Sequence, residues 1–269
     1  MYSFRNMGNT CYASAALAII CNMEEIMRPL KNAVRYAHRA GRIRRLLEDL
    51  KHNANESHVV TPSRVMETWY KHCSETQPGK QQHDPSEFLT WLFAHGKENN
   101  PLSMTGHTNT INQRLKCRGC GRESQHEEQL PVITLASASN FPEAFSQAYP
   151  RRDMIEEYHC ETCTVPQTAE MKYEVTATAK RIILFQNSGT GESLLGVPPR
   201  RIRCDGDTWV LAGFTVHGSR HHVAYVTTSV STQMACVNDE RIHTVSIGKL
   251  NENKVRAHLV IYMLKPEKG

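Results

Sequence analysis

The sequence predicts an α+β fold in which helices come first and strands follow. Apolar residues at helical spacing dominate roughly the first 100 residues, whereas short runs rich in β-branched and aromatic residues dominate the rest. Two Cys-x-x-Cys pairs fall within the strand-rich part, where they indicate a metal-bound β subdomain. Because helices and strands are segregated along the chain, the α+β class is favoured over an alternating α/β fold.

The helical part opens with two segments. Apolar residues at three- and four-residue spacing predict a first helix over residues 11–28, and either Asn9 or Thr10 can cap its start. A second helical pattern covers residues 29–51, with Gly41 as its expected break. Each segment carries apolar residues for a shared core.

Two further helices are indicated by their capping residues. Thr61 followed by Pro62 predicts a helix start, with Thr as the cap and Pro at the first helical position. Asp84 and Glu87 are spaced so that each can bond the other's backbone amide in a capping box. Apolar residues at helical spacing follow both starts.

Most of the remaining chain has the pattern of β-strands, interrupted by a short helix at residues 141–148. The strand-like runs lie at residues 130–135, 173–178, 182–185, 209–216, 222–228 and 259–264. We therefore expect one domain, 1–269, with a helical part (1–102), an inserted β subdomain (103–180) and a final β part (181–269).

Composition excludes several classes of protein. The chain has a net charge of +5 and 39% hydrophobic residues, and no apolar run approaches the roughly 20 residues that span a bilayer. No signal-peptide pattern opens it. The local excess of arginine falls within one helical stretch, as on a solvated helix face. We therefore expect neither a membrane nor a nucleic acid as partner.

The number of cysteines also bears on the cellular location of the protein. Nine cysteines is an odd number, and four of them form the two Cys-x-x-Cys pairs. Without a secretion signal, this pattern favours metal binding and catalysis over disulfides. The cytoplasm or the nucleus is the expected location.

Cys11 is the candidate nucleophile. A thiol in the first turn of a helix lies near unpaired amides and the positive end of the helix dipole, which stabilise the thiolate. Asn6, five residues earlier, carries an amide that can donate to a developing oxyanion. The alternative is that Cys11 is a small buried apolar residue, as most free cysteines are.

A base for this thiol is expected far along the chain. His217, His221 and His222 cluster at the start of a strand, and strand alternation places His221 on the opposite face from His222. His221 is the preferred candidate. Asn238 or Asp239, after a further strand, can orient the imidazole, although Asn-Asp is also a common turn dipeptide.

The two cysteine pairs predict a structural metal site. Cys117, Cys120, Cys160 and Cys163 supply four thiolates, the usual ligands of a closed tetrahedral Zn²⁺ site. The long gap between the pairs predicts two separate hairpins joined by the metal. The alternatives are a redox pair or unligated thiols. Acidic flanking residues argue against a nucleic-acid-binding zinc module.

Taken together, several segments resemble the ubiquitin-specific protease family of deubiquitinating enzymes. Residues 6–12 resemble its cysteine box, residues 82–89 its Gln/Asp element, and residues 221–225 its histidine box. Asn238 and the following aspartate fall where the third triad member is expected, and residues 257–262 resemble the closing strand. These landmarks occur in family order along almost the whole chain.

The resemblance implies a papain-like fold with a helical thumb, a β palm and zinc-bearing β fingers that grip ubiquitin. It implies that Cys11 is the nucleophile, His221 the general base and then acid, Asn238 the orienter and Asn6 the oxyanion donor. Zn²⁺ would be structural. We expect a monomer acting on ubiquitin or a ubiquitin-like protein and its conjugates.

The resemblance also implies substrate-binding residues. Asp84 would contact an arginine in the ubiquitin tail, with Gln82 and Arg220 also on the substrate side. Arg220 stands where the family has glycine, and the loop before it is shortened. This departure motivates the hypothesis of a relaxed or shifted preference that includes a ubiquitin-like modifier such as SUMO or NEDD8.

The expected reaction is hydrolysis of the isopeptide or peptide bond after a Gly-Gly C-terminus, through a thioester intermediate. Two alternatives remain at this point. The chain could be a catalytically silent scaffold that binds ubiquitin or a ubiquitin-like protein, or a protease specific for a modifier such as SUMO.

Overall fold

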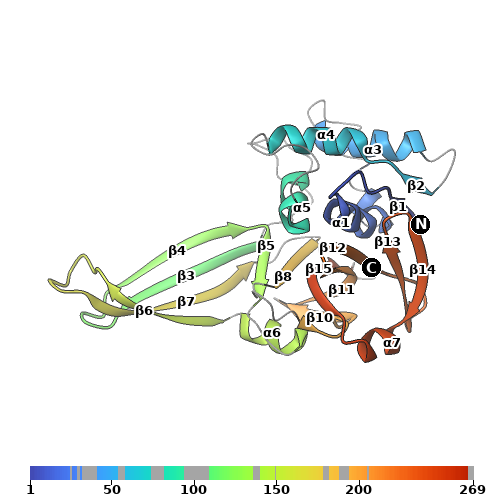
Figure 1. Ribbon diagram of the computed structural model, residues 1–269. Coiled ribbons are helices and arrows are strands. Elements are labelled where there is room, and N and C mark those ends of the chain that lie inside the picture. The colour runs from blue at the N-terminus through green and yellow to red at the C-terminus, as the bar shows by residue number, and fades with distance from the viewer. Residues whose placement is uncertain are drawn as a thin grey trace.

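The computed structural model describes residues 1–24, 26–28, 31, 41–53, 58–73, 82–93, 109–135, 140–148, 150–177, 182–187, 194–204 and 206–265. In Figure 1 the helices of the first part lie together over one end of a large sheet. A long four-stranded sheet projects away from that body, and both termini lie on the body.

The helical part contains four helices with complete bounds. These are α1 (Cys11–Cys21), α3 (Gly41–Asn53), α4 (Ser63–His72) and α5 (Pro85–Phe93). The expected break at Gly41 coincides with the start of α3, while most of residues 29–40 lie outside the described residues.

The first helix is shorter than the sequence predicts. It ends at Cys21, and Ile26, Met27 and Arg28 are helical again only after an interruption. Asn22 accounts for the end, because its side-chain amide donates to the carbonyl of Ala18 at 2.7 Å. The same side chain exchanges hydrogen bonds with the backbone of Tyr2, at 2.6 Å and 2.8 Å. These bonds tie the end of α1 to the N-terminal segment.

The start of α4 is capped differently from the prediction. Pro62, not Thr61, occupies the N-cap position, and it has no side chain to cap with. Instead Asp49 of α3 accepts hydrogen bonds from the amides of Arg64 and Val65, each at 3.1 Å. A buried carboxylate from a neighbouring helix therefore replaces the local cap.

The large sheet forms the body of the molecule. Its strands are β5 (Val132–Leu135), β8 (Ile182–Asn187), β9 (Leu194–Leu195), β10 (Arg201–Cys204), β11 (Asp207–Gly218), β12 (His221–Thr227), β13 (Gln233–Asn238), β14 (Arg241–Ser246) and β15 (Arg256–Leu264). The main order is β14-β13-β12-β11-β15-β8-β5, with β10 paired to β11 and β9 to β15. All pairs are antiparallel except β5 with β8. Two short strands, β1 (Ser3–Phe4) and β2 (Val59–Val60), pair separately.

The projecting sheet has the order β4-β3-β7-β6. Its strands are β3 (Asn109–Cys117), β4 (Glu123–Leu130), β6 (Arg151–Tyr158) and β7 (Gln167–Ala177). Between β4 and β6 the chain returns to the body to form β5 and α6 (Phe141–Ala148). The predicted boundaries near residues 102 and 180 lie outside the described residues, so that division stays a prediction.

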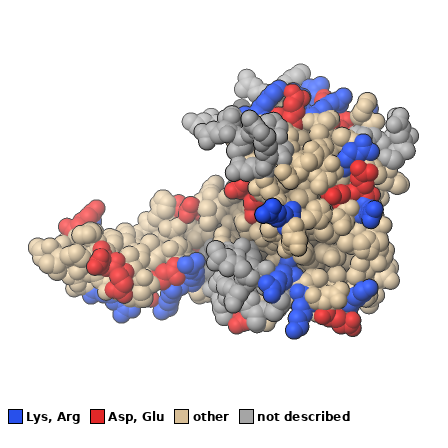
Figure 2. Space-filling model, in the orientation of Figure 1, with Lys and Arg blue, Asp and Glu red and all other residues tan. Residues whose placement is uncertain are grey.

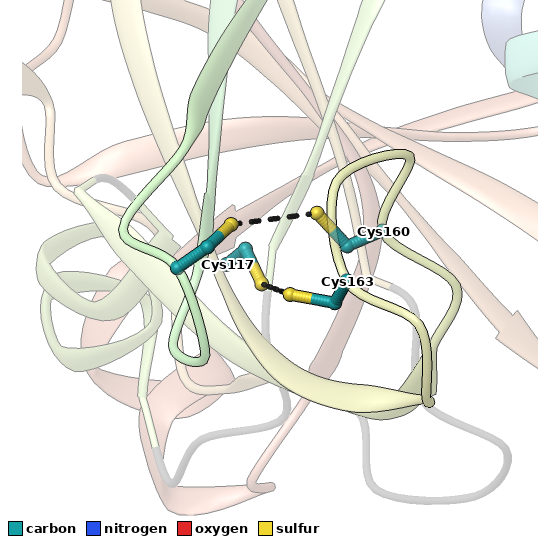
Figure 3. Close-up of side chains that lie close together, drawn as sticks. Cys117, Cys160 and Cys163 are labelled. Carbon is teal, nitrogen blue, oxygen red and sulfur yellow. Dashed lines mark hydrogen bonds between the residues drawn. The ribbon is translucent and has the colours of Figure 1, made fainter.

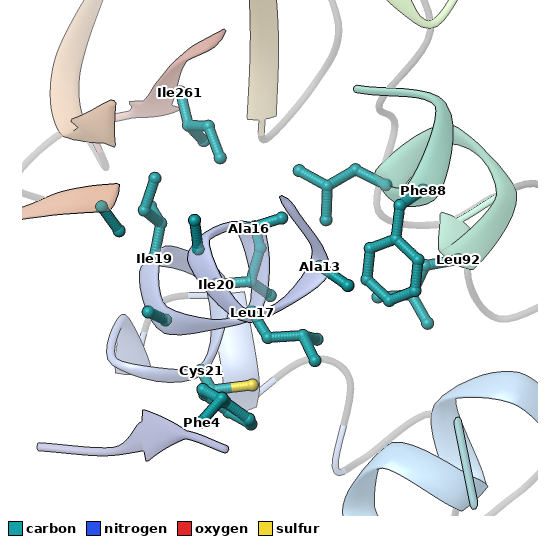
Figure 4. Packing of buried hydrophobic residues seen from close by; sticks show 14 of the residues in the cluster. Phe4, Ala13, Ala16, Leu17, Ile19, Ile20, Cys21, Phe88, Leu92 and Ile261 are labelled. Atoms are coloured by element: carbon teal, nitrogen blue, oxygen red, sulfur yellow. The ribbon is translucent and has the colours of Figure 1, made fainter. Parts of the chain in front are cut away.

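The α1 helix is the centre of the larger apolar core. Every residue from Cys11 to Cys21 is buried, so α1 is enclosed on all sides. Figure 4 shows its side chains packed between Phe88 and Leu92 on one side and Ile261 on another. Gly213 of β11 allows α1 to pack closely on the sheet. A Cβ at this position would lie 2.5 Å from the Tyr225 carbonyl oxygen and 3.1 Å from the Ile19 side chain.

A second apolar cluster lies on the other face of the sheet. It includes Phe141 of α6, Trp209 and Tyr262, together with Leu250 of α7 (Ile247–Glu252).

Among the described residues, no helix combines the length and the apolar character needed to cross a membrane.

Candidate active site and metal centre

The loop before Cys11 is held by the side chain of Asn6. Its carbonyl oxygen accepts from the amides of Gly8 at 3.1 Å and Thr10 at 3.2 Å, and from the Thr10 hydroxyl at 3.1 Å. Gly8 and Asn9 both have positive φ, at 89° and 52°, which makes the loop turn sharply into the helix. Cys11 is then the first residue of α1, as predicted, and it is only 2% exposed.

Gln82 joins the thiol to the histidine hairpin. Its Nε2 lies 3.3 Å from the Cys11 Sγ and 3.0 Å from the Arg220 carbonyl oxygen. The Cys11 sulfur therefore lies close to the backbone of Arg220, because both contact the same nitrogen. His221 directly follows Arg220 in the chain. Two segments more than 200 residues apart in sequence thus meet at a single amide group.

His221 and Asn238 form a close hydrogen bond. The distance from His221 Nε2 to Asn238 Oδ1 is 2.7 Å, whereas Nε2 lies 3.8 Å from Asp239 Oδ2. Since an amide oxygen only accepts, Nε2 is the protonated ring nitrogen. Of the two orienters that the sequence left open, Asn238 is the nearer. The strand alternates as expected, with His222 buried and His221 half-buried.

A second link connects the two halves of the site. Asn6 Nδ2 donates to Asp239 Oδ2 at 3.3 Å, so the asparagine that shapes the thiol loop also contacts the strand end beside the imidazole. The structure therefore brings Asn6, Cys11, Gln82, His221 and Asn238 into one region. The catalytic roles predicted for them stay predictions.

The hairpin that carries His221 has a two-residue turn. Gly218 pairs with His221, and the intervening Ser219 and Arg220 have φ values of 49° and 65°. Two successive positive φ values match the twist of a β-hairpin, although glycine and asparagine are the usual residues there. The shortened loop inferred from the sequence is therefore a tight turn, and the Arg220 side chain is exposed.

Asp84 lies at the start of α5, where it caps the helix and makes long-range contacts. Its Oδ1 accepts from the Ser86 amide at 2.6 Å, and its Oδ2 accepts from Gln186 Nε2 at 2.9 Å and contacts His258 Nε2 at 2.8 Å. Sequence reasoning did not identify Gln186 or His258, because nothing in their local patterns points to a residue 100 or more positions away.

The four predicted cysteine ligands converge at the far end of the projecting sheet (Figure 1). Figure 3 shows Cys117, Cys160 and Cys163 of this group. Cys117 and Cys120 come from the β3–β4 hairpin and Cys160 and Cys163 from the β6–β7 hairpin, as expected. All four sulfurs lie within 4.8 Å of one another, with separations of 3.8 Å for Cys117–Cys163 and 3.6 Å for Cys120–Cys160. Metal–sulfur bonds of about 2.3 Å at tetrahedral angles separate two sulfurs by about 3.8 Å, so the site fits such an ion.

Two of the four cysteines differ in how easily their thiols ionise. Backbone amides of Thr162 and Cys163 lower the pKa of Cys160 to about 6. Burial, followed by the neighbouring thiols, raises the pKa of Cys163 to about 12. The Cys163 thiol therefore resists ionising by itself, and a bound cation would offset the charge of its thiolate.

The comparisons with known proteins assign the family. The model of the family described as "Ubiquitin carboxyl-terminal hydrolase" matches residues 2–262, so the chain belongs to this family. It is therefore a cysteine-type deubiquitinating hydrolase. The resemblance to ubiquitin-specific proteases and the predicted α+β fold class are confirmed.

Two solved structures share the fold. One is the SAGA DUB module Ubp8/Sgf11/Sus1/Sgf73 with a Ubp8 variant, bound to monoubiquitin. It has a TM-score of 0.73 and 15% identity, covering 99% of this chain and 69% of that chain. The other is the same module bound to ubiquitin aldehyde, with a TM-score of 0.73, 14% identity, and coverage of 99% and 70%. No curated protein sequence matches the chain.

Proposed function

We propose that the chain cleaves the isopeptide or peptide bond after the Gly-Gly C-terminus of ubiquitin or a ubiquitin-like protein, with Cys11 as nucleophile. The observation that carries this proposal is the Gln82 amide, which contacts both the sulfur and the hairpin that presents His221. Family membership supports the reaction class. Residues 1–269 would act as one catalytic unit.

The proposed mechanism uses the two nitrogens of His221 differently. Because Nε2 donates to Asn238, Nδ1 is the nitrogen that takes the proton from the Cys11 thiol. The thiolate attacks the carbonyl carbon, and the imidazolium then protonates the departing amine as the C–N bond breaks. The resulting thioester is hydrolysed by a water molecule that His221 deprotonates, which restores the thiol.

Stabilisation of the tetrahedral oxyanion falls to amide donors near the sulfur. Asn6 uses one of its two amide hydrogens on Asp239, which leaves the other for the oxyanion. The Gln82 amide, 3.3 Å from the sulfur, is a second donor once substrate displaces it from Sγ. We propose Asn6 and Gln82 for this role, with Arg220 and Asp84 on the substrate side.

We propose that the four cysteines bind Zn²⁺ as a structural ion. The sulfur separations support this assignment, and four protein ligands leave no open position for catalysis. The bound ion would hold the β3–β4 and β6–β7 hairpins together at the end of the projecting sheet.

Ubiquitin is the proposed partner, because both similar structures were solved with ubiquitin or its aldehyde. We also propose that the chain acts as a monomer, although the similar Ubp8 belongs to a module of several proteins. Light scattering after size-exclusion chromatography tests this proposal. A mass of 30.5 kDa is expected, and a stable dimer would contradict it.

Nucleic acid is not a proposed partner. Basic and acidic side chains are interspersed on the face shown in Figure 2. On the projecting sheet, basic residues are paired with carboxylates, as in Lys116–Glu123, Arg118–Glu170 and Arg122–Glu161. We also propose a reducing location such as the cytoplasm or nucleus, because four of the nine cysteines gather in one candidate metal site.

A panel of fluorogenic C-terminal amides of ubiquitin, NEDD8 and SUMO tests the proposed function. The wild-type chain should hydrolyse at least one, and Cys11→Ala should lose that activity while retaining binding. Binding without hydrolysis by the wild type would support the silent scaffold instead. Hydrolysis of ubiquitin amide alone would contradict a shifted preference, and hydrolysis of SUMO amide alone would establish the modifier-specific alternative.

A further inference from the structure

Gln82 places an amide at the reactive sulfur, and the residues that follow it help to determine where that amide lies. Its Nε2 is 3.3 Å from the Cys11 Sγ and 3.0 Å from the Arg220 carbonyl oxygen. In the mechanism proposed above, this amide donates to the sulfur at rest and to the oxyanion during the reaction. The rate therefore depends on how precisely the amide is held.

Asp84, two residues after Gln82, fastens this segment to the large sheet. Its Oδ2 contacts Gln186 Nε2 of β8 at 2.9 Å and His258 Nε2 of β15 at 2.8 Å. β8 and β15 are paired strands, and their register places the two donors at neighbouring positions. The Ser86 hydroxyl adds a further link, since it donates to Gln186 Oε1 at 2.7 Å. One carboxylate oxygen thus joins the start of α5 to two strands.

The carboxyl group of Asp84 is ionised at neutral pH. Burial alone would raise its pKa, but hydrogen bonds with His258 and Ser86 lower the pKa to about 2. Because an ionised carboxylate only accepts, Nε2 of His258 carries the hydrogen. Hydrogen bonds to a charged group are stronger than neutral ones, so this junction resists displacement.

The imidazole of His258 is itself held in place by two other histidines. Its ring centroid lies 5.6 Å from that of His222 and 6.0 Å from that of His217, and these two rings stack on each other at 4.3 Å. His222 is only 4% exposed, so this group of rings is anchored in the sheet. His258 therefore presents its Nε2 to Asp84 from a fixed position.

The helices hold the same segment from the other side. The ring of His83, which lies between Gln82 and Asp84 in the chain, packs against the ring of Tyr12 with centroids 5.6 Å apart. Tyr12 directly follows the nucleophile in α1. The ring contact places the segment relative to α1, whereas the contacts of Asp84 place it relative to the sheet that carries His221.

We propose that His258 and Gln186 are positioning residues for the reaction. By holding Asp84 on the sheet, they keep the Gln82 amide at the Cys11 sulfur. This inference rests on the proposed function. Loss of either donor should loosen the amide, which weakens both its bond to the thiolate and its support of the oxyanion.

The first measurement is the pH dependence of alkylation by iodoacetamide, followed at Cys11 by mass spectrometry, which needs no substrate. In His258→Phe the midpoint should rise by about one pH unit, because the thiolate loses much of a charge-assisted hydrogen bond. His258→Gln should restore the wild-type midpoint, since its amide can still donate to Asp84. The matched control is His243→Phe on the exposed strand β14, which should leave the midpoint unchanged.

The second measurement is steady-state hydrolysis of the fluorogenic amide that the wild type cleaves best. His258→Phe and Gln186→Leu should each lower kcat about tenfold and change KM less than about twofold. Adding His258→Phe to Gln82→Ala should lower kcat by less than a further factor of about two, because no amide is left to position.

An unchanged alkylation midpoint in His258→Phe, or independent and multiplying losses in the double variant, would overturn the proposal and leave the proposed function intact. If His258→Phe does not fold, Gln186→Leu removes the other donor to Asp84 and carries the same expectations. If the wild type hydrolyses none of the amides, the proposed function fails. The alkylation profiles then still support or overturn the link between His258 and the sulfur.

Discussion

At the end of β13, the adjacent residues Asn238 and Asp239 make different contacts. Asn238 contacts the imidazole at 2.7 Å, while Asp239 contacts the loop asparagine that precedes the thiol. We therefore propose that Asn238 orients His221 and that Asp239 orients Asn6. The residue pattern alone left both neighbours open, and the family resemblance implied Asn238. The structure places Asn238 nearer to the imidazole.

This division predicts unequal effects of two alanine substitutions. Asn238→Ala should lower kcat about 10²- to 10⁴-fold, because the imidazole loses the bond that fixes its tautomer. Asp239→Ala should lower kcat less, because the Asp239 carboxylate lies 3.8 Å from the imidazole Nε2. Steady-state hydrolysis of ubiquitin amide measures both. Equal losses, or a larger loss for Asp239→Ala, would show that the roles are assigned wrongly.

The buried His222 predicts a pH dependence of stability. Burial lowers the pKa of the His222 imidazole from 6.5 to about 3. Below about pH 6.5 this imidazole is therefore protonated in the unfolded chain but stays neutral in the folded chain. Stability should therefore fall as the pH drops from 6.5 toward 3, at no more than about 1.4 kcal/mol per pH unit from this group. The lowered pKa of His217 acts in the same direction.

The carboxylate of Asp84, which interacts with His222, does not oppose this loss of stability above pH 4. The pKa of Asp84 is lowered to about 2 by its hydrogen bonds with His258 and Ser86, which outweigh burial, so its contribution to stability is lost only below the ordinary value near 3.8. Denaturant titrations from pH 7 to pH 4 should show a shallower pH slope for His222→Phe than for the wild type. An unchanged slope would mean that His222 titrates normally.

At the scale of elements, the position of α1 on the sheet depends on a missing side chain at Gly213. A Cβ there would overlap the Tyr225 carbonyl, a backbone atom that cannot easily move, and would press on Ile19. Gly213→Ala should therefore destabilise the chain by about 1–3 kcal/mol. Thermal melting measures the effect. Gly218→Ala on the same strand is the control, because a Cβ at that position has nothing within 4 Å. Equal melting temperatures for the two variants would contradict the close packing.

How far the elements could be predicted depends on their burial. Strands such as β8 and β15 carry continuous apolar residues because both faces are covered, and their positions were predicted to within a few residues. β4 and β14 are almost wholly exposed, so no alternation of buried and exposed residues marks them. They were missed, as were β3 and β6. The end of α1 and the cap of α4 were wrong because distant partners, Tyr2 and Asp49, determine them.

The candidate site shows the same division. Cys11, His221 and the four cysteines stood out because their chemistry and spacing are unusual. Gln186 and His258 did not, because an isolated glutamine or histidine in a strand has no local signature. Their contacts with Asp84 arise only when β8 and β15 pair beside the start of α5.

Across the whole molecule, the four cysteines lie at the far end of a sheet that has little core of its own. Its two edge strands, β4 and β6, carry exposed acidic residues at Glu123, Glu127 and Glu156. Apolar burial therefore contributes little there, and the metal should supply much of the local stability.

Removal of the proposed metal should unfold this end of the projecting sheet first. A strong chelator is expected to increase hydrogen exchange in β3, β4, β6 and β7 while leaving α1 protected, and to lower the melting temperature by roughly 10 °C. Readdition of Zn²⁺ should reverse both effects. Chelator-resistant melting of a protein that contains no metal by elemental analysis would contradict a structural ion.

We propose that folding joins the Cys11 sulfur to the His221 imidazole as nucleophile and base. The most direct test is reaction with a ubiquitin probe that carries a C-terminal electrophile, followed by mass spectrometric mapping of the adduct and comparison with His221→Gln. We predict a single adduct on Cys11, formed at least 100-fold more slowly in His221→Gln. An adduct on Cys21 or Cys73, or equal rates in the two proteins, would contradict the claim.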